Sequence, residues 1–283
     1  MTLRQMALDA ARTLAAAGID DETTRRDAAL LTRHLLGWDA ARWLTDQHTE
    51  ATPEVRAAFT SLIARRAARE PVAYIVGERE FYGRPFAVTR DVLIPRPETE
   101  LVVEAVLDLT RSRTGMRVLD IGTGSGCLAI TLAVERPDAR VIATDMSEAA
   151  LTVARRNAAR HAVERRFEWR LGDLLAGASS PFDAIVSNPP YVPEHERPSL
   201  DPEVREYEPA PALFAGPDGL DVIRRLVPAA APALAPGGWL VMEIGAGQST
   251  TVEEIVRQTP GLRFVRCVQD LESIPRVVIA AAS

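Results

Sequence analysis

Residues 117–130, RVLDIGTGSGCLAI, carry the pattern that decides the fold of this chain. An apolar run ends at a loop with glycine at positions 122, 124 and 126, and a second apolar run with helical spacing follows. The pattern predicts a buried strand, a glycine loop and a helix. Glycine lets the backbone turn sharply and come close to a ligand, and ligands bind beyond the carboxyl ends of the strands in such sheets. We therefore expect this loop to line a binding site.

The same alternation continues along the chain from about residue 97. Apolar segments that suit strands alternate with segments that suit helices, which predicts an α/β fold with a mostly parallel sheet covered on both faces. The predicted strands are RVLDIG, ARVIATDM, FEWRLGD, FDAIVSNPP, GWLVMEIG, LRFVRCVQ and RVVIAAA. The last two leave no room for a helix between them. We expect them to pair as a hairpin, which would make one edge strand antiparallel.

The first 70 residues have leucine and alanine at helical spacing and no strand pattern. They predict helices within residues 3–19, 24–38 and 53–70. A segment with aromatic and β-branched residues, Gly83 and prolines on both sides of Arg96 follows, and it predicts a short hairpin and a connector. We expect a helical domain at residues 1–74, a connector at 75–96 and an α/β domain at 97–283.

The composition excludes several classes of protein. Hydrophobic residues make up 47% and charged residues 25% of the 283 residues, which is typical of a soluble globular protein. No apolar run approaches the ~18–20 residues that span a bilayer, and the N-terminal segment does not resemble a secretory signal. Two distant cysteines, Cys127 and Cys267, fit a reducing compartment, and a net charge of −6 argues against a broad nucleic-acid-binding face. We expect a cytoplasmic monomer without a membrane or nucleic-acid partner.

Two common phosphate-binding patterns do not fit the glycine loop. The dinucleotide pattern G-x-G-x-x-G needs glycine where this chain has Cys127, and a P-loop needs a lysine, which the sequence lacks. Asp120, Asp145 and Asp173 instead lie at the carboxyl ends of the first three predicted strands. They predict an anionic rim that suits the ribose and the cationic groups of S-adenosylmethionine. The alternative, in which each acid caps the next helix, stays open above all for Asp173.

Asn188, Pro189, Pro190 and Tyr191 follow the apolar segment 182–187. The prolines fix the backbone and offer no N–H group, so the side-chain oxygen of Asn188 and the carbonyl oxygen of Pro189 can accept hydrogen bonds from one NH2 group. Tyr191 is expected to stack on the planar group that bears this NH2. Two acceptors would stabilise the positive charge that develops on the nitrogen during methyl transfer. An ordinary Asn-Pro turn is the alternative.

No strong general base and no metal are expected beside this motif. The four histidines, His34, His48, His161 and His195, show neither the spacing of metal ligands nor that of a catalytic triad. The expected catalytic residues are therefore Asn188, Pro189 and Tyr191, with Pro190 as a further substrate contact.

Several segments together resemble one family. GTGSG, TDMS and NPPY at these positions are similar to class I S-adenosylmethionine-dependent methyltransferases that act on amino groups. The segments GEREFYGRPFAV, LIPRPETE, SNPPYVPE, GPDGLDVIRRL and DLESIPRVVIA resemble the peptide chain release factor glutamine N5-methyltransferase family (HemK/PrmC) almost from end to end. The resemblance implies a Rossmann-like methyltransferase sheet preceded by a small helical domain that recognises the substrate.

The resemblance also implies an activity: S-adenosylmethionine-dependent methylation of the glutamine in the Gly-Gly-Gln motif of class 1 release factors. Carried over by motif, the cofactor-binding residues are Gly122, Thr123, Gly124, Ser125, Gly126, Asp145, Met146 and Asp173, together with Asn188. Asp145 would hold the ribose and Asp173 would lie near the adenine, although relatives can have an aromatic residue at that third-strand position. Residues 188–191 would bind the glutamine.

Two further features of the sequence fit this family. Arg96 and Glu100 of the segment IPRPETE are expected either to organise the pocket floor or to form a helix N-terminus. The acidic loop at residues 193–213 would suit a cationic peptide substrate; the alternative is an ordinary solvated loop.

Other functions remain open from the residues alone. Methylation of a glutamine in a ribosomal protein would use the same chemistry. Adenine-N6 methylation of nucleic acid also uses N-P-P-Y, but it should come with a basic face. A non-catalytic adenosine-binding protein would not need the acceptors of Asn188 and Pro189.

Overall fold

The computed structural model describes residues 1–178 and 181–283. The chain forms two compact units. One unit comprises residues 1–77 together with residues 201–207, and the other comprises residues 78–200 and 208–283. Each unit has its own buried apolar residues, and the two are described in turn.

The first unit is helical. Its helices are α1 (Leu3–Ala16), α2 (Asp21–Leu36), α3 (Ala40–Asp46), α4 (Pro53–Ala67), α5 (Val72–Val76) and α9 (Pro202–Tyr207). Thr2, Asp20, Asp39 and Thr52 cap α1 to α4 because each side chain accepts a hydrogen bond from a backbone N–H of the first turn. The predicted helices are confirmed, whereas the short helices α3 and α5 were not predicted.

Helix α9 joins this unit through ion pairs, although it lies far away in the sequence. Glu203 accepts hydrogen bonds from Arg66 at 2.8 Å and from Arg69 at 2.6 Å. The same Arg66 pairs with the buried Asp27 at 2.7 Å, and the hydroxyl of Tyr207 donates to the carbonyl of Ala68 at 2.6 Å. Residues 201–207, which the sequence pattern places within 97–283, therefore pack with the helical unit.

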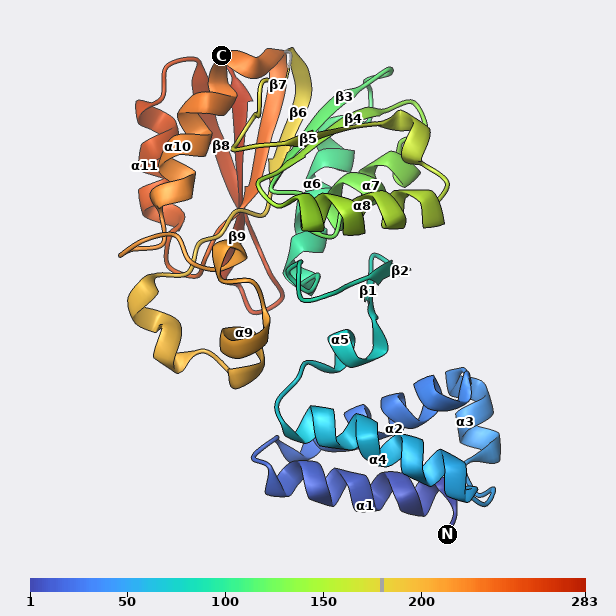
Figure 1. The fold of residues 1–283 in the computed structure, drawn as a ribbon. Coiled ribbons are helices and arrows are strands. Elements are labelled where there is room, and N and C mark those ends of the chain that lie inside the picture. Colours follow the sequence, from blue (N-terminus) through green and yellow to red (C-terminus); the bar gives the residue numbers. More distant parts are fainter. Residues whose placement is uncertain (179–180) are drawn as a thin grey trace. The chain divides into compact units, whose positions relative to one another are not determined.

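The second unit is built on a sheet with the strand order β5-β4-β3-β6-β7-β9-β8 (Figure 1). Its strands are β3 (Arg117–Ile121), β4 (Arg140–Asp145), β5 (Phe167–Leu171), β6 (Phe182–Ser187), β7 (Leu234–Glu243), β8 (Leu262–Gln269) and β9 (Pro275–Ala282). Strands β3 to β7 pair in parallel, which confirms the predicted mostly parallel sheet.

The C-terminal hairpin lies at the edge of the sheet, as expected, and its second strand is the one that pairs with the rest of the sheet. Strand β9 is antiparallel to both β7 and β8, and it lies between them. The antiparallel strand is therefore the second from the edge. The predicted antiparallel edge hairpin is therefore confirmed, but the pattern within each strand did not show which of the two strands would pair with β7.

Helices cover both faces of this sheet (Figure 1). Helices α6 (Glu100–Leu109), α7 (Cys127–Glu135) and α8 (Glu148–Arg160) contribute Val102, Leu128 and Ala158 to one buried cluster. Helices α10 (Asp221–Ala230) and α11 (Ser249–Gln258) contribute Ile223 and Val252 to the cluster on the other face. Short 3-10 turns occur at Pro97–Thr99, Glu164–Arg166, Glu194–Ser199, Ala210–Ala212 and Ala231–Ala233.

The predicted connector contains a hairpin of β1 (Glu78–Phe81) and β2 (Arg84–Ala87), which packs on the α/β unit. Phe81 and Phe86 are buried in the same cluster as α6 to α8. The fully buried Asn157 of α8 accepts a hydrogen bond from the Ala87 N–H at 2.8 Å and donates to the Ala87 carbonyl at 3.0 Å. Its amide also donates to the carbonyl of Ser125 at 2.8 Å, so one side chain ties the hairpin to the glycine loop.

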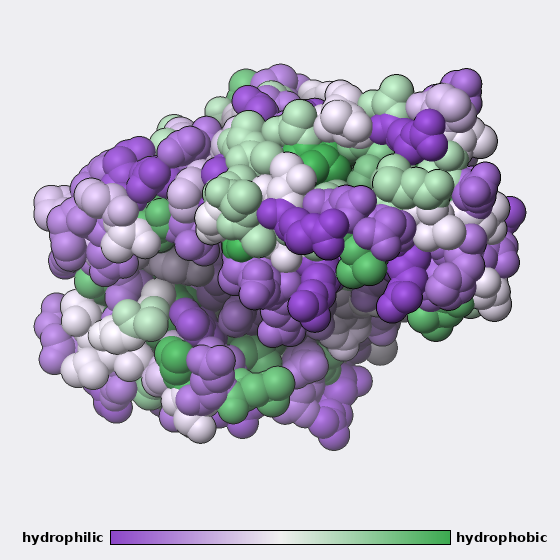
Figure 2. Space-filling model, turned by 90° about the horizontal axis from the view of Figure 1, so that it is seen from below, coloured by the Kyte–Doolittle hydropathy of each residue, from purple (hydrophilic) through white to green (hydrophobic). Residues whose placement is uncertain are grey.

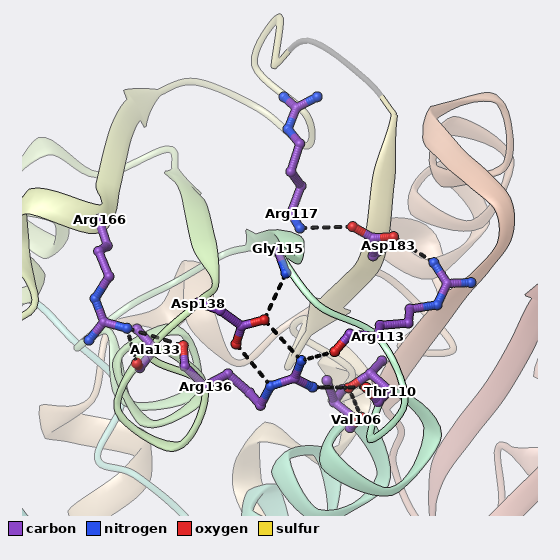
Figure 3. Close-up of polar contacts among 10 residues, drawn as sticks. All are labelled: Val106, Thr110, Arg113, Gly115, Arg117, Ala133, Arg136, Asp138, Arg166 and Asp183. Atoms are coloured by element: carbon purple, nitrogen blue, oxygen red, sulfur yellow. Dashed lines mark hydrogen bonds and ion pairs between the residues drawn. The ribbon is translucent and has the colours of Figure 1, made fainter.

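The turns at the amino ends of the strands are held by arginines (Figure 3). The Arg136 guanidinium donates to the carbonyls of Thr110 at 2.9 Å and Arg113 at 2.6 Å, and it pairs with Asp138 at 3.2 Å. Asp138 in turn accepts from the Gly115 N–H at 2.7 Å. This cluster fixes the end of the sheet that lies opposite the glycine loop.

Exposed apolar residues are scattered over the surface. Figure 2 shows one face of the molecule on which hydrophilic and hydrophobic residues are interspersed. The most exposed large apolar side chains include Leu44, Met146 and Leu271.

Within residues 1–178 and 181–283, no helix combines the length and the apolar character that crossing a membrane requires.

Candidate functional site

A cavity of about 570 Å³ lies at the carboxyl ends of β3, β4 and β6. It brings together most of the predicted site residues. The predicted residues that line it are Gly122, Thr123, Gly124, Ser125, Asp145, Met146, Asp173, Asn188, Pro189 and Pro190. Gly126 and Tyr191 are not among the residues that line this cavity.

The three glycines of the loop have different structural roles. All have positive φ angles, of 73° at Gly122, 55° at Gly124 and 82° at Gly126. A Cβ atom at Gly126 would lie 2.7 Å from Cδ1 of Ile130 and 3.2 Å from Cβ of Ala154. A Cβ atom at Gly122 or Gly124 would have no neighbour within 4 Å. Gly126 thus permits close packing of α7 and α8, whereas the other two leave space along the cavity.

Asp145, at the end of β4, holds the glycine loop in place. Its Oδ2 accepts a hydrogen bond from the Gly124 N–H at 2.9 Å, and its Oδ1 accepts from the Ser147 N–H at 2.9 Å. Because each carboxylate oxygen has more than one lone pair, Asp145 can still accept hydrogen bonds from a ligand in the cavity.

Asp120 lies below the same loop and is buried. Thr123 donates to its Oδ2 at 2.6 Å. Burial raises the pKa of Asp120 to about 7, and the nearby charge of Asp145 acts in the same direction. Oδ1 of Asp120 and Oγ of Ser125 are buried without a hydrogen-bond partner among the described residues. Unpartnered buried polar atoms at a cavity fit a ligand that carries hydrogen-bonding groups.

The predicted anionic rim needs a correction. Asp120, Asp145 and Asp173 do line one cavity, but they do not form an exposed row of negative charge. Asp120 is 1% exposed, and Asp173 forms an ion pair with Arg225, which also lines the cavity. The arginine was missed because it lies on α10, 52 positions away in the sequence. Arg225 therefore balances the charge of Asp173.

Asn188 and Pro189 present free acceptors at the cavity. The Nδ2 of Asn188 donates to Oγ1 of Thr99 at 3.0 Å. In the described part of the chain, neither Oδ1 of Asn188 nor the carbonyl oxygen of Pro189 accepts a hydrogen bond. Both acceptors of the N-P-P-Y motif are thus available to a ligand.

Tyr191 is held by a buried carboxylate. Its hydroxyl donates to Oε1 of Glu243 at 3.0 Å, and its ring packs with the cluster under α10 and α11. Burial raises the pKa of Tyr191, and the charge of Glu243 raises it further. The ring does not line this cavity. The expected stacking of Tyr191 on the substrate stays a prediction.

Glu243 and Thr99 are the residues that sequence reasoning missed. Glu243 ends β7 and is 1% exposed, and its Oε2 accepts from the Thr99 hydroxyl at 2.5 Å. Burial raises the pKa of Glu243 to about 7. A single carboxylate inside the apolar segment GWLVMEIG was the available signal.

In the segment IPRPETE, Arg96 lies at the cavity and Glu100 does not, so a role in organising the pocket floor stays a prediction for Arg96 alone. Arg96 lines the cavity and pairs with Glu208 at 2.5 Å. Glu100 does not line the cavity; its Oε1 accepts a hydrogen bond from the Tyr82 N–H of the hairpin at 2.7 Å. Pro97 begins a 3-10 turn and Glu100 begins α6, so the segment also forms a helix N-terminus.

The acidic loop is partly neutralised within the chain. Glu194 pairs with Arg197 at 3.0 Å and Glu206 pairs with Arg205 at 2.9 Å, while Glu203 and Glu208 pair with arginines as described above. The expectation that its acids meet a cationic substrate stays a prediction for the remaining ones.

Comparison with known proteins identifies similar domains and relatives. Residues 5–77 match the family model of the PrmC N-terminal domain, and residues 98–201 match that of the methyltransferase small domain. A release factor glutamine methyltransferase of Koribacter versatilis is 45% identical over 281 residues, which cover 99% of this chain and 98% of that protein. One from Cereibacter sphaeroides is 48% identical over 267 residues, which cover 94% of each.

A solved structure supports the fold. The hMettl16 catalytic domain in complex with MAT2A 3'UTR hairpin 6 matches with a TM-score of 0.56 and 18% identity, over 78% of this chain and 81% of that one. At this identity the likeness concerns the fold alone.

Proposed function

Because the chain belongs to the family of release factor glutamine methyltransferases, whose activity is methylation of a glutamine in release factors, we propose that its cavity takes S-adenosylmethionine and that Asn188 and Pro189 hold the glutamine amide. The substrate we propose is the glutamine of the Gly-Gly-Gln motif in class 1 release factors. The observation that carries this proposal is the pair of unpartnered acceptors at Asn188 and Pro189, beside the glycine loop in one cavity.

The residues of the cavity fit the proposed cofactor. When bound, S-adenosylmethionine supplies a methyl group on a positively charged sulfur. Gly122 and Gly124 leave space for close approach, and Thr123, Ser125 and Asp120 offer polar groups, two of which have unpartnered buried atoms. The carboxylate of Asp145 suits ribose hydroxyls. Met146 and Asp173 also line the cavity, and we propose that they lie near the adenine of the cofactor.

Asn188 and Pro189 perform the proposed chemistry by orienting a weak nucleophile. The nitrogen of a glutamine amide is a poor nucleophile because its lone pair is delocalised into the carbonyl group. Two acceptors that bind its two N–H groups hold the nitrogen in one orientation and stabilise the positive charge that develops on it. By analogy with the loss of one oxyanion-hole donor, the loss of one acceptor should lower kcat roughly 10²–10³-fold. Pro190 keeps this backbone rigid because its φ angle is fixed.

The helical unit is proposed to recognise the release factor outside the glutamine loop. It matches the N-terminal domain model of the family, and it includes α9 from the loop that follows N-P-P-Y. We also propose that the protein acts as a monomer in the cytoplasm, where release factors function.

The test is methyl transfer from labelled S-adenosylmethionine to purified release factor. Label should appear on the factor, and it should disappear when the glutamine of its Gly-Gly-Gln motif is replaced by alanine. The enzyme variant Asn188→Ala should transfer the label roughly 10²–10³-fold more slowly. Label on a ribosomal protein or on nucleic acid, with none on release factor, would overturn the substrate assignment and retain the methyltransferase site. Full activity of Asn188→Ala would overturn the role of Asn188.

A further inference from the structure

The usefulness of Asn188 depends on which way its amide faces. An asparagine amide has an acceptor on one side and a donor on the other, and the two orientations have nearly the same shape. If the amide were turned by 180°, its NH2 group would face a substrate NH2 group, and two donors do not form a hydrogen bond. Something in the protein must therefore set the orientation.

Thr99 contacts the amide directly. Its hydroxyl has a single hydrogen, and Thr99 uses it to donate to Oε2 of Glu243 at 2.5 Å. The hydroxyl oxygen is then left as an acceptor, and it accepts from Nδ2 of Asn188 at 3.0 Å. An Asn188 oxygen at the same place would meet another oxygen without a hydrogen between them.

Glu243 fixes the direction of this chain of hydrogen bonds. An ionised carboxylate only accepts hydrogen bonds, and Tyr191 occupies the second oxygen of Glu243 at 3.0 Å. Thr99 and Glu243 are each 1% exposed, so these hydrogen bonds lie in a mostly desolvated place. The sequence of bonds runs from Asn188 through Thr99 to Glu243.

We propose that Glu243, acting through the hydroxyl of Thr99, is a positioning residue that orients the Asn188 amide with its oxygen available to the substrate. The proposal rests on the proposed function of Asn188 as an acceptor. Glu243 also links the two motifs in the structure: Thr99 belongs to IPRPETE, Tyr191 belongs to N-P-P-Y, and both donate to this one carboxylate.

Protonation of Glu243 would remove this constraint. A protonated carboxyl group can donate to Thr99, whose hydroxyl can then donate to a reversed Asn188 amide. Glu98 favours protonation of Glu243 and Arg276 opposes it, while the Thr99 and Tyr191 hydroxyls stabilise the ionised form. Burial has the largest effect and raises the pKa of Glu243 to about 7. The orientation should therefore weaken below neutral pH.

The kinetic test compares Thr99→Val with Thr99→Ser. Valine has nearly the shape of threonine without the hydroxyl, whereas serine keeps the hydroxyl. An unsatisfied buried donor should favour the reversed amide, so we expect Thr99→Val to lower kcat roughly 10- to 100-fold. Thr99→Ser should restore most of this loss. The Kd for S-adenosylmethionine should change less than kcat in both variants, since the amide orientation concerns the glutamine.

A pH profile provides a readout that a merely structural role would not change. Wild-type kcat should fall as the pH drops below about 7, whereas Glu243→Gln should have a lower plateau and lack this acid limb. Equal kcat values for Thr99→Val and Thr99→Ser, or an unchanged acid limb in Glu243→Gln, would overturn the proposal. Inactive Asn188→Ala combined with fully active Thr99→Val would overturn it and leave the proposed function intact.

The orientation of the Asn188 amide can also be tested without catalysis, so this second test applies even if release factor is not the substrate. The side-chain NH2 of Asn188 can be followed by NMR in 15N-labelled protein. In the wild type and in Thr99→Ser, one N–H should be protected from solvent exchange. Thr99→Val should lose this protection, and retained protection in that variant would contradict the proposal.

Discussion

The glycine loop offers a sharp test, because substitution of two of its glycines should affect different properties: stability at Gly126 and cofactor binding at Gly124. Gly124→Ala and Gly126→Ala place the same methyl group on two left-handed residues that are two positions apart. At Gly124 the added Cβ atom would have no neighbour within 4 Å, in a residue that lines the cavity. At Gly126 it would lie 2.7 Å from the side chain of Ile130 and 3.2 Å from that of Ala154, which are both fully buried.

The magnitudes follow from these contacts. A left-handed conformation costs a residue with a Cβ atom about 1–2 kcal/mol, and this cost applies to both variants. Overpacking in a well-packed core costs about 1–3 kcal/mol more, and it applies to Gly126→Ala alone. We therefore expect Gly126→Ala to be less stable than Gly124→Ala by about 2 kcal/mol. In an α/β unit of this size that difference lowers the melting temperature by roughly 4–8 °C.

Binding should show the opposite order. The methyl group of Gly124→Ala occupies space that the proposed cofactor would use, so its Kd for S-adenosylmethionine should rise at least about tenfold. Folded Gly126→Ala should bind with a smaller loss. Thermal unfolding with and without S-adenosylmethionine measures both quantities in one experiment. If Gly124→Ala were the less stable variant, or if it bound the cofactor normally, the assignment of packing to Gly126 and of ligand approach to Gly124 would be wrong.

Three further predictions concern the buried carboxylate, the arginine cluster and the position of Tyr191. Burial raises the pKa of Glu243 from 4.5 to about 7, so its contribution to stability is complete below pH 4.5 and is lost as the pH rises through about 7. Glu243→Gln should therefore reduce the slope of the unfolding free energy against pH between 4.5 and about 7. Arg136→Met should lower the unfolding free energy by about 2–3 kcal/mol in urea denaturation, because the partly buried carbonyls of Thr110 and Arg113 lose a charged donor. Arg155→Met, which removes an exposed ion pair, should change it by less than about 0.5 kcal/mol. Gly219→Ala would place a Cβ atom 2.1 Å from the Tyr191 carbonyl oxygen, and it should lower kcat at least about tenfold in the methyl-transfer assay. The control variant Gly247→Ala, whose Cβ atom would have no neighbour within 4 Å, should not lower kcat in this way.

The sequence predicted local structure well because local structure depends on local spacing. The strands around the glycine loop and the helices that follow them lie where the alternation predicted. Helices α3 and α5 escaped prediction because they are only seven and five residues long, too short to establish a helical period. The placement of β9 between β7 and β8 depends on pairing such as Val241 with Ile279, which no pattern within a single strand encodes.

The candidate site was predicted only in part for a related reason. Asn188 and the glycine loop are recognisable because each motif is contiguous. Thr99 and Glu243 are separated by 144 positions, and neither has an unusual local context apart from its polarity. Their importance arises only when the fold brings them together with Asn188. The same holds for Glu203, whose pairing with Arg66 and Arg69 spans more than 130 positions and assigns residues 201–207 to the helical unit.

The connector hairpin shows how the two halves of the site are supported from one place. Glu100, directly after Thr99, accepts from the Tyr82 N–H of the hairpin, so the hairpin fixes the segment that contacts Asn188. Asn157 bonds to both backbone groups of Ala87 and to the carbonyl of Ser125, so the same hairpin also fixes the glycine loop. Methyl transfer requires a nitrogen and a methyl group to be aligned within a fraction of an ångström. A support shared by the glycine loop and the segment beside Asn188 would keep the proposed cofactor side and the proposed glutamine side in a constant relative position.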